Sequence, residues 1–358
     1  MSHSHCVSFQ NGNAETLHGI LQMPATRVHS SLGIVLLSPG QKSRIGPWLS
    51  YVQLARRIAA LGVPVLRFDY HGLGDSEGSH RHGQTLVDFN GFVQTGGLAR
   101  DVIAAADFFA TEAGVKHFVF VGLCGGASTG LIAAQHIEGV YGHVLVDLPV
   151  TVSNSARQRY LEQNAAELLR LRPEESRGVL QNYFARLRDP AAWKRFLSGA
   201  SDYALLIEAV KRVSSRGAAA MLSRIPFIHR RTVEPVAPPP QPTSKQPSGE
   251  DERVNETAVS AFHSATARGQ KIFFLNSSAY QPMFDRYFAR EHLAGANAHP
   301  GIGLLTVPET NHVLSAEHGQ RALFECVDEF VRNAIAELAE RPSALQRLSR
   351  RGSSLVER

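Results

Sequence analysis

The sequence predicts an α/β fold in which a mostly parallel sheet is covered by helices and interrupted by an inserted helical cap. Continuous apolar runs at 33–40 and 63–72 are typical of strands buried on both faces. A segment with helical spacing of its apolar residues separates them. With 358 residues, 43% of them hydrophobic, the chain has enough material for a large core.

The expected elements alternate between strand and helix, as in a parallel sheet with right-handed crossovers. A leading hairpin with its turn near 11–13 precedes them. The helix at 47–62 has Pro47 in its first turn and Gly62 at its end, which are ordinary start and stop signals. The further elements are expected at 98–114 (helix), 117–123 (strand), 127–137 (helix), 142–149 (strand), 271–278 (strand), 302–312 (strand) and 319–340 (helix).

The alternation stops at about residue 151, where a long stretch contains almost no strand-like run. The segment "EPVAPPPQPTSKQPSGEDERVNE" that follows is rich in proline and polar residues, a composition typical of disorder. We therefore divide the chain into a first part of the core at 1–150, a helical cap at 151–232, a Pro-rich loop at 233–260, a second part of the core at 261–340 and a basic tail at 341–358.

Composition excludes several classes of protein. The net charge of +5 comes without a basic face that carries interleaved aromatic residues, so we expect no nucleic-acid partner. No apolar run approaches the length of a membrane span, and the polar N-terminus is unlike a signal peptide. Three cysteines without metal-type spacing are typical of a reducing cytoplasm. We expect a cytoplasmic protein that needs no metal or cofactor.

One motif contains a candidate catalytic residue. It is "HFVFVGLCGGASTG", which places Cys124 in the pattern G-x-C-x-G between a predicted strand and a predicted helix. A nucleophile on a sharp strand-to-helix turn is the signature of the α/β-hydrolase fold. Gly122 and Gly126 would give the turn the space that it needs. The helix N-terminus would favour a thiolate at Cys124, and the N–H of Gly125 would face a developing oxyanion.

Two further residues complete most of the expected site. The second oxyanion donor should follow the strand at 33–40, where the backbone N–H of Gln41, or else that of Lys42, is the candidate. The general base should follow the last strand, and "VPETNHVLSAEHG" supplies His312 there.

The acid that would orient His312 has two candidates. Asp285 lies beyond the strand at 271–278, where the usual chain order would place it, and Asp147 ends the strand after the elbow. A third possibility is an amide orienter, Gln281 or Asn276, because Cys-His-Asn sites work without a carboxylate.

The sequence also resembles a known family. "LSPGQKSRIGPWLSYVQLARRIAALGVPVLRFDYHGLGDSEG", "VGLCGGAS" and "NHVLSAEHGQRALFECVDEFV" resemble segments of α/β-hydrolases of the serine aminopeptidase-like group. The resemblance is closest to the exosortase-associated hydrolases of bacterial exopolysaccharide gene clusters. It covers most of residues 7–340 and implies Cys124 as nucleophile and His312 as base. Gln281 stands where the pattern of that family has an acid.

These observations favour an enzyme that acts on a small-molecule acyl substrate, an ester or a thioester, through an acyl group on Cys124. Water would make it an esterase-like hydrolase, and a hydroxyl or amine acceptor would make it an acyltransferase. The alternative is a catalytically inactive hydrolase fold that serves as a binding component of an exopolysaccharide pathway. The absence of an acid at Gln281 favours that alternative, whereas the elbow and His312 oppose it.

Overall fold

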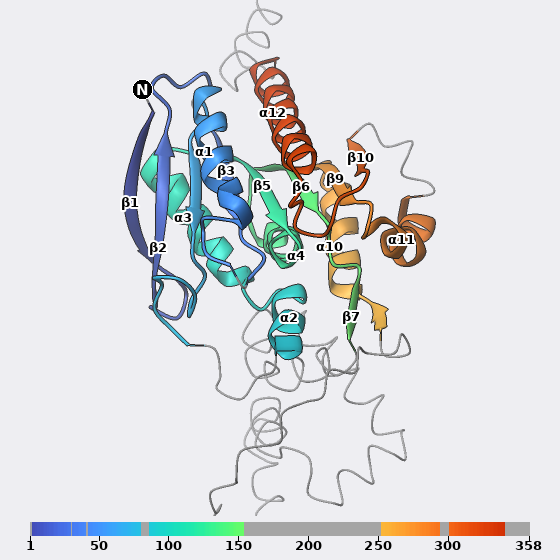
Figure 1. The fold of residues 1–358 in the computed structure, drawn as a ribbon. Coiled ribbons are helices and arrows are strands. Elements are labelled where there is room, and N and C mark those ends of the chain that lie inside the picture. The colour runs from blue at the N-terminus through green and yellow to red at the C-terminus, as the bar shows by residue number, and fades with distance from the viewer. Residues whose placement is uncertain are drawn as a thin grey trace, which may run out of the picture. The chain divides into compact units, whose positions relative to one another are not determined.

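The computed structural model describes residues 2–29, 31–40, 42–79, 86–153, 252–293 and 301–340 (Figure 1). The chain divides into two units, one formed by residues 1–157 with 251–358 and the other by residues 158–250. Nearly all of the predicted cap, most of the Pro-rich loop and the basic tail lie outside the described residues.

An eight-stranded sheet forms the centre of the first unit, in the order β1-β2-β4-β3-β5-β6-β9-β10. The leading hairpin β1–β2 is antiparallel, and β2 also pairs with β4 in the antiparallel sense. All other neighbours in this sheet are parallel. Its strands are β1 (His3–Gln10), β2 (Thr16–Met23), β3 (Leu32–Leu37), β4 (Val65–Phe68), β5 (His117–Leu123), β6 (Val140–Val146), β9 (Lys271–Ser277) and β10 (Ile302–Val307).

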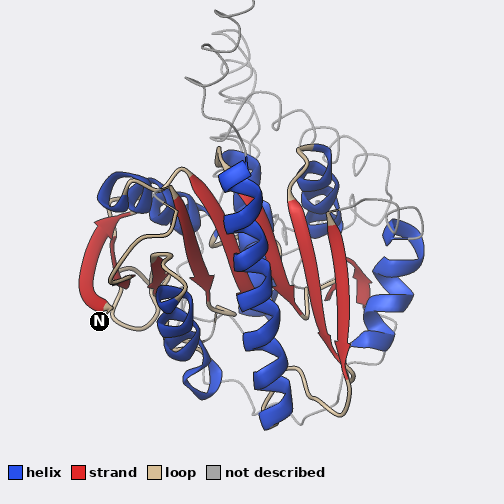
Figure 2. Ribbon diagram, turned by 90° about the horizontal axis from the view of Figure 1, so that it is seen from above, coloured by secondary structure: helices blue, strands red, loops and turns tan. Residues whose placement is uncertain are grey.

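Helices cover both faces of the sheet. The long helix α12 crosses one face, and α1 packs on the same side (Figure 2). The helices α3, α4 and α10 pack on the opposite side. The helical elements are η1 (Pro47–Leu49), α1 (Ser50–Ala60), α2 (Leu86–Gln94), α3 (Ala99–Ala113), α4 (Gly125–Ala133), η2 (Ala134–His136), α10 (Glu256–Ala267), α11 (Gln281–Phe284), the π-helix η3 (Asp285–Leu293) and α12 (Glu317–Glu340).

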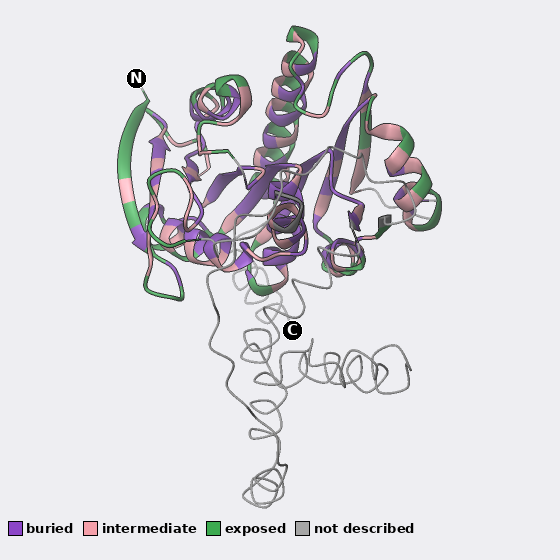
Figure 3. Ribbon diagram, turned by 60° about the horizontal axis from the view of Figure 1, so that its bottom comes forward, coloured by how far each residue is buried: buried purple, intermediate pink, exposed green. Residues whose placement is uncertain are grey.

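The alternation of side chains along β5 explains why its sequence is a continuous apolar run. Val119 and Val121 face the core under α1 and α12, whereas Phe118 and Phe120 face the core under α3 and α4. Both faces of the central strands are therefore buried (Figure 3). A mostly parallel sheet, helices on both faces and a strand–turn–helix at Cys124 confirm the predicted α/β-hydrolase fold.

Two boundaries differ from the sequence-based division. The first residues of the predicted cap form a strand, β7 (Thr151–Ser153), which pairs with β8 (Glu252–Val254). The helix α10 begins inside the predicted Pro-rich loop, where the side chain of Asn255 accepts a hydrogen bond from the N–H of Ala258. Asn255 also donates to the carbonyl oxygen of Pro149, at 3.0 Å, so the second part of the core includes residues before 261.

Candidate active site

Cys124 occupies a sharp turn between β5 and α4. Its backbone angles are φ 51° and ψ −120°, a conformation that non-glycine residues rarely adopt. The turn is held on both sides: the N–H of Cys124 donates to Val146 at 2.8 Å, and its carbonyl oxygen accepts from Ala127 at 2.8 Å. This is the geometry expected of a nucleophile elbow.

The glycines on either side of Cys124 are required by close backbone contacts. A Cβ atom at Gly126 would lie 2.1 Å from the carbonyl oxygen of Leu37, and one at Gly122 would lie 2.5 Å from the backbone nitrogen of Ala127. Real Cβ atoms do not approach backbone atoms this closely. The G-x-C-x-G pattern therefore lets α4 begin directly against β3 and β5.

A hydrogen bond joins the imidazole of His312 to Asp147. The His312 Nδ1 atom lies 2.9 Å from the Asp147 Oδ2 atom. Asp147 comes directly after β6 and is fully buried, whereas the side chain of His312 is 43% exposed in the loop between β10 and α12. The carboxylate is therefore shielded from solvent, whereas the imidazole ring is partly accessible to it.

The electrostatics of the site favour a protonated imidazole. Hydrogen bonds to Asp147 and then to the Cys124 thiol raise the pKa of His312 from 6.5 to about 10, against the opposing effect of partial burial. The protonated ring can donate a proton to a group that reacts at Cys124. The arrangement can therefore supply both a nucleophile and a proton donor.

Two residues that the sequence analysis did not single out position Asp147, one by direct hydrogen bonds and one through the chain that follows it. Ser277, at the end of β9, donates to the carboxylate through its N–H and through its hydroxyl, each at 2.7 Å. Tyr280 fixes the chain after Asp147, because its hydroxyl donates to the Leu148 carbonyl oxygen at 2.8 Å and accepts from the N–H of Val150 at 2.9 Å. The only sequence signal for Ser277 is a polar residue at the carboxyl end of a buried strand.

The other candidate acid is engaged elsewhere. Asp285 begins the helix η3, and its Oδ1 atom accepts from the Gln281 amide at 2.7 Å. The amide oxygen of Gln281 accepts in turn from Asn276 at 3.0 Å and from Thr306 at 2.7 Å. The structure therefore brings Asp147, and not Asp285, Gln281 or Asn276, into a hydrogen bond with His312.

One of the two expected oxyanion donors is described. Gly125 is the first residue of α4, so its N–H is one of those for which a helix provides no carbonyl acceptor. Gly125 also lies close to the loop after β3, since a Cβ atom there would be 2.7 Å from the carbonyl oxygen of Pro39. Gln41, the second expected donor, lies outside the described residues.

Neither a metal site with three or more protein ligands nor a membrane span is found in the part of the chain that the structure describes. Within that part, no group of three or more His, Cys, Asp or Glu side chains is arranged to hold a metal ion. No helix among the described residues is both long enough and apolar enough to cross a bilayer.

No protein-family profile matches the sequence, and no curated protein matches it. Solved structures with a similar chain path include an esterase of Pyrococcus furiosus, with 13% identity, a TM-score of 0.47 and coverage of 92% of this chain and 91% of that one. A dienelactone hydrolase of Anabaena variabilis has 12% identity, a TM-score of 0.47 and coverage of 93% and 98%. The Butyrivibrio proteoclasticus protein Est1E, solved with ferulic acid bound, has 13% identity, a TM-score of 0.48 and coverage of 92% and 99%.

Proposed function

We propose that this protein transfers acyl groups from esters or thioesters through a covalent intermediate on Cys124. The observation that carries the proposal is the hydrogen bond between His312 and Asp147 at the carboxyl end of the parallel sheet, with Cys124 near enough to His312 to affect its pKa. Cys124 is the nucleophile in this proposal, His312 exchanges protons with the reacting groups, and Asp147 orients the imidazole and stabilises its charge.

In the acylation step, the thiolate of Cys124 attacks the carbonyl carbon and forms a carbon–sulfur bond. The carbonyl oxygen takes the negative charge and accepts a hydrogen bond from the N–H of Gly125. When the tetrahedral intermediate collapses, the bond to the alcohol or thiol breaks. The leaving group departs with its electron pair and takes the proton from His312.

In the deacylation step, His312 is neutral and accepts a proton from water or from another acceptor with a hydroxyl or amine group. The activated oxygen or nitrogen attacks the thioester carbon, and the carbon–sulfur bond breaks. Sulfur leaves as the thiolate, so His312 is again an imidazolium and the site is restored. Water as acceptor makes the protein a hydrolase, and another acceptor makes it an acyltransferase.

Incubation with short-chain p-nitrophenyl esters and acyl thioesters, followed by intact mass spectrometry, tests the proposal. We expect a mass increase of one acyl group, located on the peptide that contains Cys124. Cys124→Ala should abolish both the adduct and the release of p-nitrophenol. Cys6→Ser is the matched control, because Cys6 is an exposed thiol on β1, remote in sequence from the site.

Two results would contradict the proposal. The first is turnover that survives in Cys124→Ala. The second is the absence of any adduct or turnover across the whole series of esters and thioesters, which would favour the alternative of an inactive fold that binds a component of an exopolysaccharide pathway. Addition of an alcohol or amine during turnover separates the two enzymatic outcomes, since only an acyltransferase would form the new ester or amide in preference to the free acid.

A further inference from the structure

Two histidines from neighbouring helices face each other on the side of the sheet that α10 covers. His263 lies on α10, and His292 lies near the end of the π-helix η3. The His263 Nε2 atom is 3.2 Å from the His292 Nδ1 atom. The two residues are 29 positions apart in the chain, so no sequence pattern of metal-type spacing indicates this pair.

Buried aromatic rings join the two helices beneath the histidines. Phe262 on α10 and Phe288 on η3 are both buried, and their ring centroids lie 5.1 Å apart. Each phenyl ring also contacts one imidazole, since the centroids of Phe262 and His263 are 5.3 Å apart and those of Phe288 and His292 are 5.1 Å apart. Core packing therefore sets the separation of the two imidazoles.

The separation of the two rings matches that of two ligands on one tetrahedral ion. Zinc–imidazole bonds of about 2.0–2.1 Å at tetrahedral angles place two nitrogens about 3.3 Å apart and the ring centroids about 5.2 Å apart. The observed distances are 3.2 Å between the nitrogens and 5.1 Å between the centroids. A straight hydrogen bond between the same nitrogens would place the centroids about 5.5 Å apart. The rings are thus bent away from a straight line, as a shared ion requires.

The chemistry of the pair favours a divalent transition-metal ion. Imidazole nitrogen is a ligand for zinc, copper and nickel, whereas magnesium and calcium prefer oxygen. The proton that the two rings share would move to the outer nitrogen of its ring, His263 Nδ1 or His292 Nε2, and both facing nitrogens would then be free to bind. His263 is exposed and His292 is half-buried, so an ion can enter from solvent.

We infer that His263 and His292 together bind one divalent transition-metal ion such as Zn²⁺ between α10 and η3, with water in its remaining positions. The ion links the end of η3 to α10, in addition to the contact between the two phenylalanines. Two protein ligands are fewer than the three or four of most zinc sites, so this ion exchanges with the solvent. The inference is independent of the proposed function, because it involves neither Cys124 nor His312.

Calorimetric titration of the metal-free protein with zinc chloride at about pH 8, where histidines are mostly neutral, tests the inference. The protein carries Cys6→Ser and Cys124→Ala, so that neither of these accessible thiols competes for zinc. His263→Gln and His292→Gln should each weaken the binding of one ion by at least about 10–100-fold, because loss of a mere outer partner of a ligand costs that much. The double variant should lose no further zinc, because both residues serve one site.

The variant with both His3→Gln and His5→Gln is the matched control. These two exposed histidines lie on one face of β1 and form the other pair of nearby imidazoles most open to a metal ion. The control should bind the ion with unchanged affinity. Zinc binding that is unchanged in His263→Gln, or that is lost in the control instead, would overturn the inference.

Hydrogen exchange measures the link between the helices. In the same Cys-substituted protein, zinc should slow amide exchange of residues 285–293 by about tenfold, and it should have no such effect in His292→Gln. Binding at the pair without slower exchange of η3 would refute the link. A thermal melt of each variant without zinc confirms that it is folded before the comparison is made.

Discussion

The imidazole of His312 and the carboxylate of Asp147 lie 2.9 Å apart, although the two residues are 165 positions apart in the chain. Parallel strands explain the meeting, because the carboxyl ends of β6 and β10 reach the same edge of the sheet. Asp147 follows β6, and the loop with His312 follows β10. Their contact is the relationship on which the proposed chemistry depends.

The first prediction concerns the identity of the acid. Asp147→Asn should lower kcat/KM for ester turnover by about 100-fold, because a neutral amide no longer stabilises the imidazolium of His312. Asp285→Asn is the matched control, since that carboxylate is bound to Gln281. Steady-state kinetics with a p-nitrophenyl ester provide the measurement. The opposite ranking of the two variants would assign the acid to Asp285.

The second prediction concerns pH. The pKa of His312 is raised from 6.5 to about 10 in the folded protein, so its contribution to stability is complete below pH 6.5 and is lost as the pH rises from 6.5 to 10. The melting temperature should therefore fall over this interval more in the wild-type protein than in His312→Gln. Equal slopes of melting temperature against pH in the two proteins would contradict the raised pKa.

The same pKa predicts the alkaline limb of activity. kcat/KM for an ester with a poor leaving group should decline near pH 10, where His312 loses the proton that the leaving group needs. In Asp147→Asn the limb should move to lower pH, because hydrogen bonding to Asp147 is the largest cause of the shift. An unchanged alkaline limb in that variant would mean that the Asp147 carboxylate does not raise the pKa of His312.

The third prediction concerns Ser277 as a positioning residue. Ser277→Ala removes one of two donors to Asp147 and leaves the backbone N–H at 2.7 Å. We expect kcat to fall about tenfold, because a hydrogen bond to a charged group contributes a free energy of about that size. KM should stay unchanged, and the alkaline limb of the pH–activity profile should shift. Ser277→Thr, which keeps the hydroxyl, should restore both. A purely structural role would lower the melting temperature without moving the limb.

The fourth prediction concerns the elbow. Gly126→Ala would place a methyl group 2.1 Å from the carbonyl oxygen of Leu37, and we expect a loss of about 3 kcal/mol in the free energy of unfolding. Gly12→Ala is the matched control, since nothing lies within 4 Å of its added carbon, and it should change stability by less than about 0.5 kcal/mol. Chemical denaturation measures both. Equal stabilities would mean that β3 and α4 can separate without cost.

Much of the architecture followed from local sequence patterns. Strands buried on both faces are largely apolar along their whole length. The sequence therefore predicts β3, β5, β6 and β9 from continuous apolar runs. The pattern G-x-C-x-G predicts the elbow, because the neighbouring backbone atoms leave no space for a side chain at the two glycines. The sequence analysis does not predict the helix α10, because its cap at Asn255 comes directly after a polar, Pro-rich stretch that was assigned to a loop.

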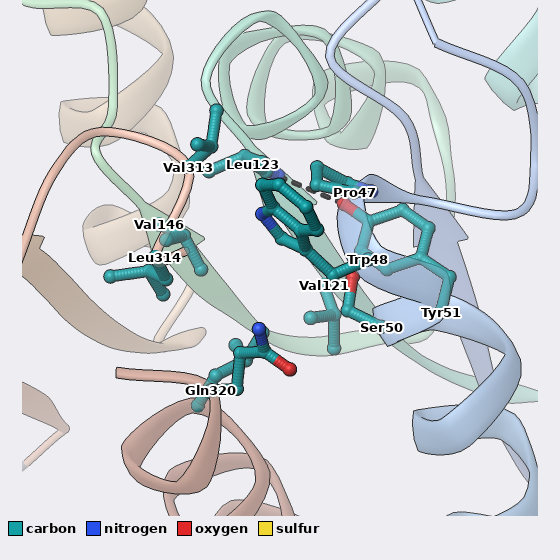
Figure 4. Close-up of a pocket in the computed structure, with 11 residues that line it drawn as sticks. Pro47, Trp48, Ser50, Tyr51, Val121, Leu123, Val146, Val313, Leu314 and Gln320 are labelled. Carbon is teal, nitrogen blue, oxygen red and sulfur yellow. Dashed lines mark hydrogen bonds between the residues drawn. The ribbon is translucent and has the colours of Figure 1, made fainter. Parts of the chain in front are cut away.

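The sequence by itself determined the fold class and the candidates Cys124 and His312, because short-range patterns and chain order carry that information. The tertiary structure alone decided that His312 contacts Asp147 and that Ser277 holds this carboxylate, since the contact requires β6 and β9 to be neighbours across the intervening insertion. The small gap drawn in Figure 4 is also a tertiary feature, because its lining comes from η1, α1, β5, β6, the loop before α12 and α12 itself. Such contacts depend on how distant segments pack, and no local pattern encodes them.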